Sequence, residues 1–139
     1  MAESSQHLKL VNLILQYFEA RWISTDGFVV LSDYSNRIGD DNKPPRIGGY
    51  SPDVFGIDAP LTVMAIGEAK TSEDLTRPHS REQLAAYLEH LRYQPKGILV
   101  LAVPCFFAAS ARTVVETAKR SVGLTSEEIE VVVLELLEG

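Results

Sequence analysis

Residues 97–103, Gly-Ile-Leu-Val-Leu-Ala-Val, form a continuous apolar run without a polar side chain. The run has the length of a β-strand, and successive side chains on a strand point to opposite faces of the sheet. Both faces of this strand must therefore be covered, which is typical of a strand inside an α/β sheet. Segments with helical periodicity lie on either side of it in the sequence. The run thus predicts an α/β domain with helices on both faces of a sheet.

The rest of the chain supplies the other elements. Helical periodicity is found in three segments: Ser4 or Ser5 to about Arg21, Ser80 to about Tyr93, and within 106–122. The predicted apolar stripe of the first helix consists of Leu8, Val11, Leu15, Phe18 and Trp22. Further strands are predicted at 28–31, 52–57, 61–70 and 129–137. The order αβββαβαβ predicts a mixed central sheet flanked by helices.

Length and composition limit the classes of protein that this chain can belong to. With 139 residues it is predicted to form one domain, 1–139, with a core at about 4–103 and a C-terminal helix and strand within 106–137. Cys105 is the single cysteine, which excludes an internal disulfide and a cysteine zinc site. The sequence has no apolar run of membrane-spanning length and no signal peptide, so we expect a soluble cytoplasmic protein.

The charge of the chain is unevenly distributed. A net charge of -6 argues against a nucleic-acid partner, because phosphate binding normally calls for a basic surface. Residues 124–139, however, contain five acids and no Lys or Arg. Outside that segment 14 acids stand against 13 bases, so the remainder is nearly neutral. The composition therefore weakens a nucleic-acid interpretation without excluding it.

Two predicted strands joined by the turn 58–60 bring charged side chains together. Asp53 lies on the first strand, and Glu68 and Lys70 share one face of the second. Two neighbouring carboxylates repel each other and need a compensating cation when they lose water. Mg²⁺ suits such a site, since it takes one or two carboxylates and leaves room for water and phosphate. The alternative is an ordinary salt bridge at a strand end.

Several other positions allow two interpretations. Glu19 lies on the border of the apolar stripe of the first helix and is either a site residue or simply solvated. Gln83 and Tyr87 lie one turn apart on the second predicted helix and share a face. Ser80-x-x-Gln83 is also a capping-box pattern, which alone would explain Gln83. Asp58 is either an extra ligand or a residue that stabilises the turn.

Segment 32–51 lacks apolar periodicity and is rich in Gly, Pro and Asp, so it is predicted to be a long loop. With its three basic residues it either surrounds a polyanion or merely connects two elements. The histidines are scattered without the spacing of metal ligands. His7 and His90 are predicted on helix surfaces, and His79 is close to the candidate site in sequence.

The motif Pro52-Asp53, fourteen intervening residues and Glu68-Ala69-Lys70 resembles the signature of the PD-(D/E)XK nuclease superfamily. This superfamily includes restriction endonucleases, archaeal Holliday junction resolvases and the nuclease domains of recombination helicases. The predicted order of helix, three strands, helix and strand is similar to the core of the superfamily. The resemblance covers about residues 4–103 and implies a restriction-endonuclease-like fold.

The resemblance also implies roles for individual residues. The ligands of Mg²⁺ or Mn²⁺ would be Asp53, Glu68, the main-chain carbonyl of Ala69, and Glu19 on the first helix. Lys70 would position or activate the attacking water. Gln83 and Tyr87 match a Gln-x-x-x-Tyr pattern of several branches and would support the site or contact DNA. These roles describe a metal-dependent phosphodiesterase.

The function implied is that of an endonuclease that acts on a particular DNA structure, for example branched or single-stranded DNA. The chain departs from typical members in its acidic balance and in being barely larger than the core. We therefore expect a homodimer or a partner-targeted subunit, and the apolar strand 131–134 would otherwise leave an exposed edge. Two alternatives stay open: a catalytically silent nuclease-fold module that binds or regulates within a nucleic-acid-processing assembly, and an unrelated α/β protein in which the motif is a coincidence.

Overall fold

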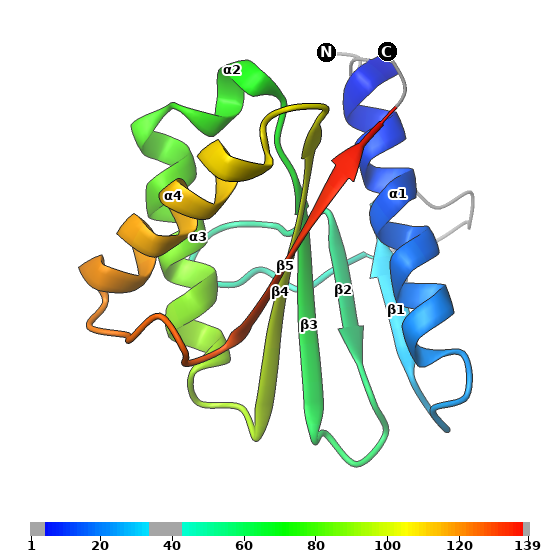
Figure 1. Cartoon of the computed structure of the whole chain (residues 1–139). Coiled ribbons are helices and arrows are strands. Elements are labelled where there is room, and N and C mark those ends of the chain that lie inside the picture. Colours follow the sequence, from blue (N-terminus) through cyan, green and yellow to red (C-terminus); the bar gives the residue numbers. More distant parts are fainter. Residues whose placement is uncertain (1–4, 34–42, 138–139) are drawn as a thin grey trace.

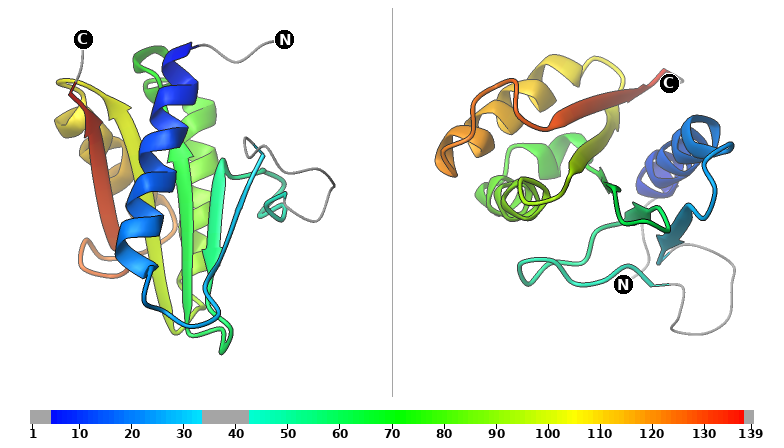
Figure 2. Two further views of the ribbon diagram at one scale, coloured as in Figure 1. Left: turned by 90° about the vertical axis from the view of Figure 1, so that its right-hand side faces the viewer. Right: turned by 90° about the horizontal axis from the view of Figure 1, so that it is seen from below.

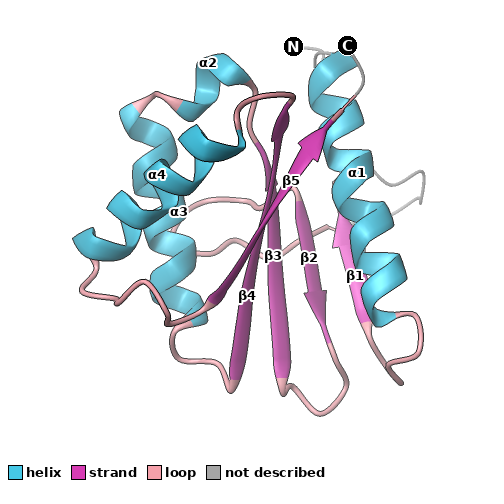
Figure 3. Cartoon of the chain, in the orientation of Figure 1, coloured by secondary structure: helices cyan, strands magenta, loops and turns pink. Residues whose placement is uncertain are grey.

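A five-stranded mixed sheet lies between one long helix and a pair of helices (Figures 1 and 3). The computed structural model describes residues 5–33 and 43–137. The strands are β1 (Val29–Ser32), β2 (Val54–Ile57), β3 (Val63–Ala69), β4 (Lys96–Pro104) and β5 (Glu130–Leu136). The helices are α1 (Ser5–Trp22), α2 (Ser72–Leu75), α3 (Pro78–Leu91) and α4 (Ala108–Ser121).

The strands are arranged in the order β1-β2-β3-β4-β5. β1, β2 and β3 are antiparallel neighbours, whereas β3, β4 and β5 are parallel. The predicted α/β class with a mixed sheet and helices on both faces is therefore confirmed. The predicted order lacked one element, the short helix α2, so the observed order is αβββααβαβ.

Each face of the sheet has its own hydrophobic core, and Figure 2 shows α1 on one side and α3 with α4 on the other. Residues 98–103 of β4 are completely buried, as the continuous apolar run predicts. Ile98, Val100 and Ala102 face the α1 core, and Leu99, Leu101 and Val103 face the α3–α4 core. The sheet therefore gains hydrophobic stabilisation from both layers.

The apolar stripe of α1 differs from the prediction at its edge. Leu10 and Ile14 are fully buried, whereas the predicted core residue Leu8 is 44% exposed. Val11, Phe18 and Trp22 are buried as predicted. The buried stripe therefore runs through Leu10 and Ile14 and leaves Leu8 outside it. No helix among the described residues is long and apolar enough to cross a membrane.

α1 approaches β3 very closely because Gly67 has no side chain. A Cβ atom at Gly67 would lie 2.6 Å from Ile14 Cγ2 and 3.2 Å from Val54 Cβ. Both distances are below ordinary van der Waals contact. Gly67, the residue directly before Glu68, therefore allows α1 to pack close to β3.

The predicted long loop 32–51 begins one residue too early, because Ser32 is the last residue of β1. Its described residues 43–51 pack against the α3 side of the sheet. Ile47 and Tyr50 bond each other's main chain across Gly48 and Gly49, with N···O distances of 2.7 and 3.0 Å. Both glycines have positive φ angles, 60° and 88°, as a tight hairpin turn requires. Ile47 is buried in the α3–α4 core. Residues 34–42 of the loop lie outside the described residues.

Candidate functional site

The β2–β3 pairing brings Asp53 and Glu68 together. Val54 is paired with Gly67 in the antiparallel ladder, so the next residues outward, Asp53 and Glu68, lie opposite each other. Opposite residues of an antiparallel pair point to the same side of the sheet. The Asp53 main-chain N–H donates to Glu68 Oε1 at 3.4 Å, and the Ala69 N–H donates to Asp53 Oδ2 at 2.8 Å. The predicted juxtaposition of the two carboxylates is present in the structure.

Lys70 follows the end of β3 and shares its side of the sheet with Glu68. Its main-chain N–H donates to the carbonyl of Ala102 at 3.0 Å, which continues the β3–β4 ladder by one residue. Its Nζ lies 3.7 Å from Glu68 Oε2 and donates a hydrogen bond to Gln83 Oε1. The ammonium group is therefore held between an acid and an amide.

Gln83 and Tyr87 reach this group from α3. Gln83 Nε2 lies 3.3 Å from Glu68 Oε2 and 3.2 Å from the Tyr87 hydroxyl oxygen. The Tyr87 hydroxyl donates to Glu68 Oε1 at 3.3 Å. The two residues lie one turn apart, so one face of α3 delivers both. Two strands and one helix thus converge on Glu68.

The capping-box interpretation of Gln83 is wrong. α3 begins at Pro78, with Arg77 as its N-cap residue. Ser80 is therefore the third residue of the helix, and its hydroxyl donates to the carbonyl of Asp74. Ser80 does not cap α3, and the Gln83 side chain points to Lys70 and Glu68 instead.

The electrostatics of the group centre on Glu68, whose side chain is almost fully enclosed. Burial raises the pKa of Glu68 well above its usual range, and the neighbouring Asp53 carboxylate raises it further. The Lys70 ammonium acts in the opposite direction and lowers the pKa of Glu68. Burial also raises the pKa of Tyr87, so its hydroxyl stays protonated and remains a donor. Two carboxylates against one ammonium leave a negative group that favours a proton or a cation.

Two carboxylates of this group could bind a hard divalent ion such as Mg²⁺ or Mn²⁺. Among the described residues, no three His, Cys, Asp or Glu side chains lie close enough together to hold a metal ion. A structural zinc site commonly needs four protein ligands, whereas Mg²⁺ binds through one or two carboxylates and keeps several waters. The residues that would hold the ion are Asp53 and Glu68. The main-chain carbonyl of Ala69 is the third predicted ligand beside these two carboxylates. The main-chain N–H of the same residue donates to Asp53 Oδ2.

The charged side chains are nearly closed to solvent. Asp53 keeps 11% of its side-chain surface exposed, Lys70 8% and Glu68 6%. Every buried side-chain nitrogen or oxygen in the described part of the chain has a hydrogen-bond partner. Of the two carboxylates of the site, Asp53 is therefore the more accessible from solvent.

Glu19 is not brought into this group. It lies on an exposed part of α1, twelve residues beyond His7. At a rise of about 1.5 Å per residue, that separation is about 18 Å along the helix axis. The end of α1 that lies near Asp53 is its N-terminal end.

His7 occupies the place on α1 that approaches the site. Its Nε2 lies 3.6 Å from Asp53 Oδ1, and its side chain is only 14% exposed. The prediction of His7 as a helix-surface residue is therefore wrong. Spacing along the sequence gave no sign of this contact, because it depends on how α1 crosses the sheet. The imidazole of His7 can accept or donate a proton next to the Asp53 carboxylate.

Asp58 stabilises a turn. Its Oδ1 accepts hydrogen bonds from the main-chain N–H groups of Thr62 at 2.7 Å and Val63 at 3.0 Å, and the Thr62 hydroxyl donates to Oδ2. These bonds, the Thr62 hydroxyl first, lower the pKa of Asp58. Asp58 lies at the end of β2 that is remote from Asp53, so the turn interpretation accounts for its environment.

An aromatic group borders the site on the side of segment 43–51. The Tyr50 ring lies edge-on to Tyr87, with centroids 6.3 Å apart, and edge-on to His79 at 5.5 Å. His79 and Tyr87 thus both contact the Tyr50 ring. The part of the long loop that is described therefore forms one wall of the candidate site.

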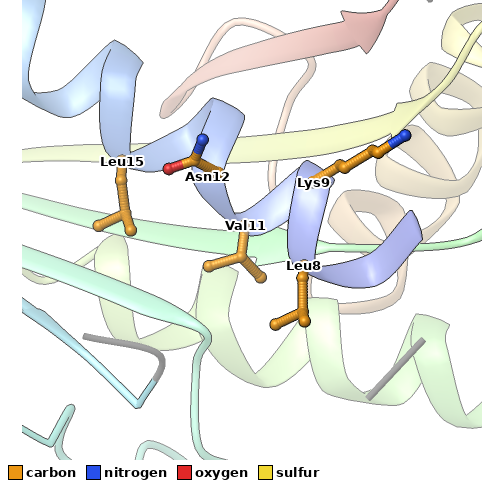
Figure 4. A pocket seen from close by; sticks show the side chains of 5 residues that line it. All are labelled: Leu8, Lys9, Val11, Asn12 and Leu15. Carbon is orange, nitrogen blue, oxygen red and sulfur yellow. The ribbon is translucent and has the colours of Figure 1, made fainter. Parts of the chain in front are cut away.

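A separate surface pocket of about 320 Å³ lies along α1. Figure 4 shows that Leu8, Val11 and Leu15 project to the same side of the helix there. Lys9 and Asn12 complete its lining, and none of the site residues contributes. With one titratable side chain, this pocket offers no group of residues for catalysis.

Comparison of the chain with protein-family models, with curated proteins and with solved structures finds no significant match.

Proposed function

We propose that this protein is a metal-dependent nuclease of the PD-(D/E)XK type that hydrolyses DNA phosphodiester bonds, acting as an endonuclease on a particular DNA structure. The observation that carries the proposal is the convergence of Asp53, Glu68 and Lys70 on one side of two paired strands, with Gln83 bonded to both Lys70 and Glu68. A chance match of the sequence motif does not require these side chains to meet.

The chemistry follows from the placement of each group. Asp53 and Glu68 would hold Mg²⁺ or Mn²⁺, and when bound this ion supplies positive charge against the negative charge that develops on the phosphate. Lys70 would orient the attacking water or take a proton from it. Gln83 accepts a hydrogen bond from Lys70 Nζ and so fixes the direction of the ammonium group. Preorganised groups of this kind need little rearrangement during the reaction.

A second candidate function has its own support. The site side chains are only 6% to 11% exposed, and the net charge is -6. Both features fit a catalytically silent nuclease-fold module that binds or regulates within a nucleic-acid-processing assembly. In that function Lys70, Gln83 and Tyr87 serve to satisfy a buried Glu68 and do not act on a substrate.

Cleavage assays with purified protein distinguish the two functions. We expect the protein to nick plasmid or to cut branched or single-stranded DNA with Mg²⁺ or Mn²⁺ and to be inactive with EDTA. Asp53→Asn, Glu68→Gln and Lys70→Met should each lower the rate by at least about 100-fold, the usual effect of removing a charged catalytic group.

Glu73→Gln is the matched control, because Glu73 is an exposed acid next to the site in sequence. It should retain full activity, and circular dichroism should show that all four variants are folded. Retention of wild-type activity by Asp53→Asn, Glu68→Gln and Lys70→Met would assign the cleavage to a contaminant. Wild-type protein that cuts no DNA under any metal condition, yet binds a partner, would support the silent module.

A further inference from the structure

We propose that the aromatic wall of the candidate site, formed by Tyr50 and His79, is a stacking site for an unpaired DNA base. The substrate class would then be single-stranded DNA, or the unpaired segment of a branched DNA, and not continuous duplex. This inference rests on the proposed nuclease function and adds to it the part of the substrate that the protein recognises.

The aromatic side chains lead from the site to the solvent. The Tyr87 hydroxyl bonds Glu68 at 3.3 Å, and Tyr87 is completely buried. The Tyr50 ring, whose centroid is 6.3 Å from that of Tyr87, is half-buried. The His79 ring, 5.5 Å from Tyr50, is exposed. Tyr50 is therefore connected to Glu68 through a single side chain, and His79 extends the aromatic surface outward.

The hairpin around Gly48 holds Tyr50 in place. Ile47 and Tyr50 bond each other's main chain, and Ile47 is buried in the α3–α4 core. Gly48 lies against α3, because a Cβ atom there would be 2.8 Å from Ala86 Cβ. The Tyr50 ring is therefore positioned before a ligand arrives, and a preorganised group loses little entropy on binding.

The outer side of the hairpin has room for a ligand. A Cβ atom at Gly49 would meet no atom within 4 Å apart from its chain neighbours. Residues 43–51 contain two basic residues, Lys43 and Arg46, and no acid. Both basic residues are exposed. A DNA backbone that passes along the hairpin therefore meets no carboxylate from this segment.

The charge of the chain favours base stacking over phosphate contacts. The net charge is -6, and Arg77 near the start of α3 is engaged by Glu73 and Asp74. Binding to duplex depends largely on phosphate contacts, because the faces of paired bases are covered by their neighbours. An unpaired base exposes its π face, and stacking on an aromatic side chain changes the affinity by about 5- to 100-fold for each base. An acidic protein with an aromatic wall at its site therefore suits an unpaired base.

The alternative is that Tyr50 only packs the hairpin against α3. In that case another apolar side chain could replace the ring without loss of DNA binding. Tyr50→Leu distinguishes the two roles, because leucine keeps an apolar contact and removes the ring. His79→Leu provides a second variant whose position is exposed, so that it should not disturb the core.

Fluorescence anisotropy in EDTA tests the inference, because it measures binding without metal and without cleavage. The full chain should bind a labelled oligothymidylate more tightly than a labelled duplex. Tyr50→Leu and His79→Leu should each weaken binding of the single strand at least about fivefold. Tyr50→Phe keeps the ring and should retain wild-type affinity. Tyr93→Leu is the matched control, because Tyr93 is a 74% exposed tyrosine just beyond the other end of α3. It should bind like the wild type.

An oligothymidylate that contains one 5-iodouracil locates the contact. Irradiation joins this base to an aromatic ring on which it is stacked, and peptide mapping should identify Tyr50 or His79 as the attached residue. Attachment only to other residues would overturn the stacking site. Circular dichroism should show that each variant is folded.

The outcomes separate this inference from the proposed function. Single-strand binding that depends on Tyr50, without cleavage under any metal condition, would support the stacking site and contradict the nuclease. Cleavage that needs Asp53 and Glu68 but is unchanged in Tyr50→Leu and His79→Leu would support the nuclease and overturn the stacking site. Wild-type affinity of both leucine variants for the single strand would overturn the stacking site whether or not the protein cuts DNA.

Discussion

At the scale of single residues, Gln83 shows how one neutral side chain serves two charged neighbours. Its amide oxygen accepts from Lys70, and its amide nitrogen donates toward Glu68 and Tyr87. Because an amide has one accepting and one donating end, turning it over would set its nitrogen against the Lys70 ammonium. Gln83 is therefore held in one orientation. Its two hydrogen bonds hold the Lys70 ammonium close to the Glu68 carboxylate.

The repulsion between Asp53 and Glu68 gives a stability prediction. The pKa of Glu68 is raised in the folded protein, so the folded state binds a proton more tightly than the unfolded state. The contribution of Glu68 to the free energy of unfolding is favourable below the ordinary glutamate pKa. This contribution is lost as pH rises through the raised pKa of the folded state. Asp53→Asn removes one cause of the shift. Without metal, it should raise the free energy of unfolding at neutral pH by about 1–2 kcal/mol, and by less near pH 4.

Asp58→Asn is the matched control for that measurement, because Asp58 is another buried carboxylate on the same hairpin. Its pKa is lowered in the folded state, so its stabilisation is present at neutral pH and is lost as pH falls through the lowered value. Asp58→Asn should therefore destabilise the protein at neutral pH. Urea unfolding across the pH range measures both variants, and a loss of stability in Asp53→Asn at neutral pH would contradict the repulsion.

Sequence spacing predicted part of the candidate site well. Asp53, Glu68 and Lys70 could be placed together because a short turn and the two-residue period of strands fix their relation. The position of Glu19 could not be fixed in this way. It depends on which end of α1 lies near Asp53, and a helical stripe does not specify that end. The contact of His7 was missed for the same reason.

At the scale of elements, the contact between α1 and β3 limits what the strand can tolerate. Gly67→Ala would place a methyl group 2.6 Å from Ile14 Cγ2 and should lower the free energy of unfolding by about 1–3 kcal/mol. In the double variant Gly67→Ala, Ile14→Ala the closer of the two contacts, with Ile14 Cγ2, is removed. The cost of the double variant should be clearly less than the sum of the two single variants, as a thermodynamic cycle from urea unfolding can show.

Ile14→Val provides the control for this cycle, because valine keeps a γ-methyl group at the point of contact. Gly67→Ala should therefore cost about as much in the Ile14→Val background as in the wild type. Equal costs in all three backgrounds would show that the clash is not with Ile14.

The elements themselves were predicted to different degrees. β4 follows from composition alone, since an uninterrupted apolar run needs two covered faces. The four-residue helix α2 is too short to show a period, and it forms because the Thr71 hydroxyl accepts from the Asp74 N–H at 3.4 Å. The start of α3 was placed two residues late because Ser80 resembled a cap, whereas the helix begins at Pro78.

At the scale of the whole molecule, the acidic charge would limit how strongly the proposed DNA substrate can be held. Arg77, between α2 and α3, forms ion pairs with Glu73 at 3.7 Å and Asp74 at 3.4 Å. Few phosphate contacts should therefore form, and a plot of log affinity against log salt should have a slope of only about -1 to -3. Fluorescence anisotropy of a labelled oligonucleotide over increasing KCl measures the slope. A value near -6 or steeper would reveal a basic surface in this protein.

Gln83 and Tyr87 belong to the same face of α3, and both bond Glu68. A slide of α3 by a single residue, about 1.5 Å along its axis, would stretch these bonds and the bond to Lys70 simultaneously. The contacts that α3 makes with Glu68 and Lys70 would therefore be lost together. A molecule that displaced α3 would therefore change the hydrogen bonding of Glu68 and Lys70 without contacting either carboxylate.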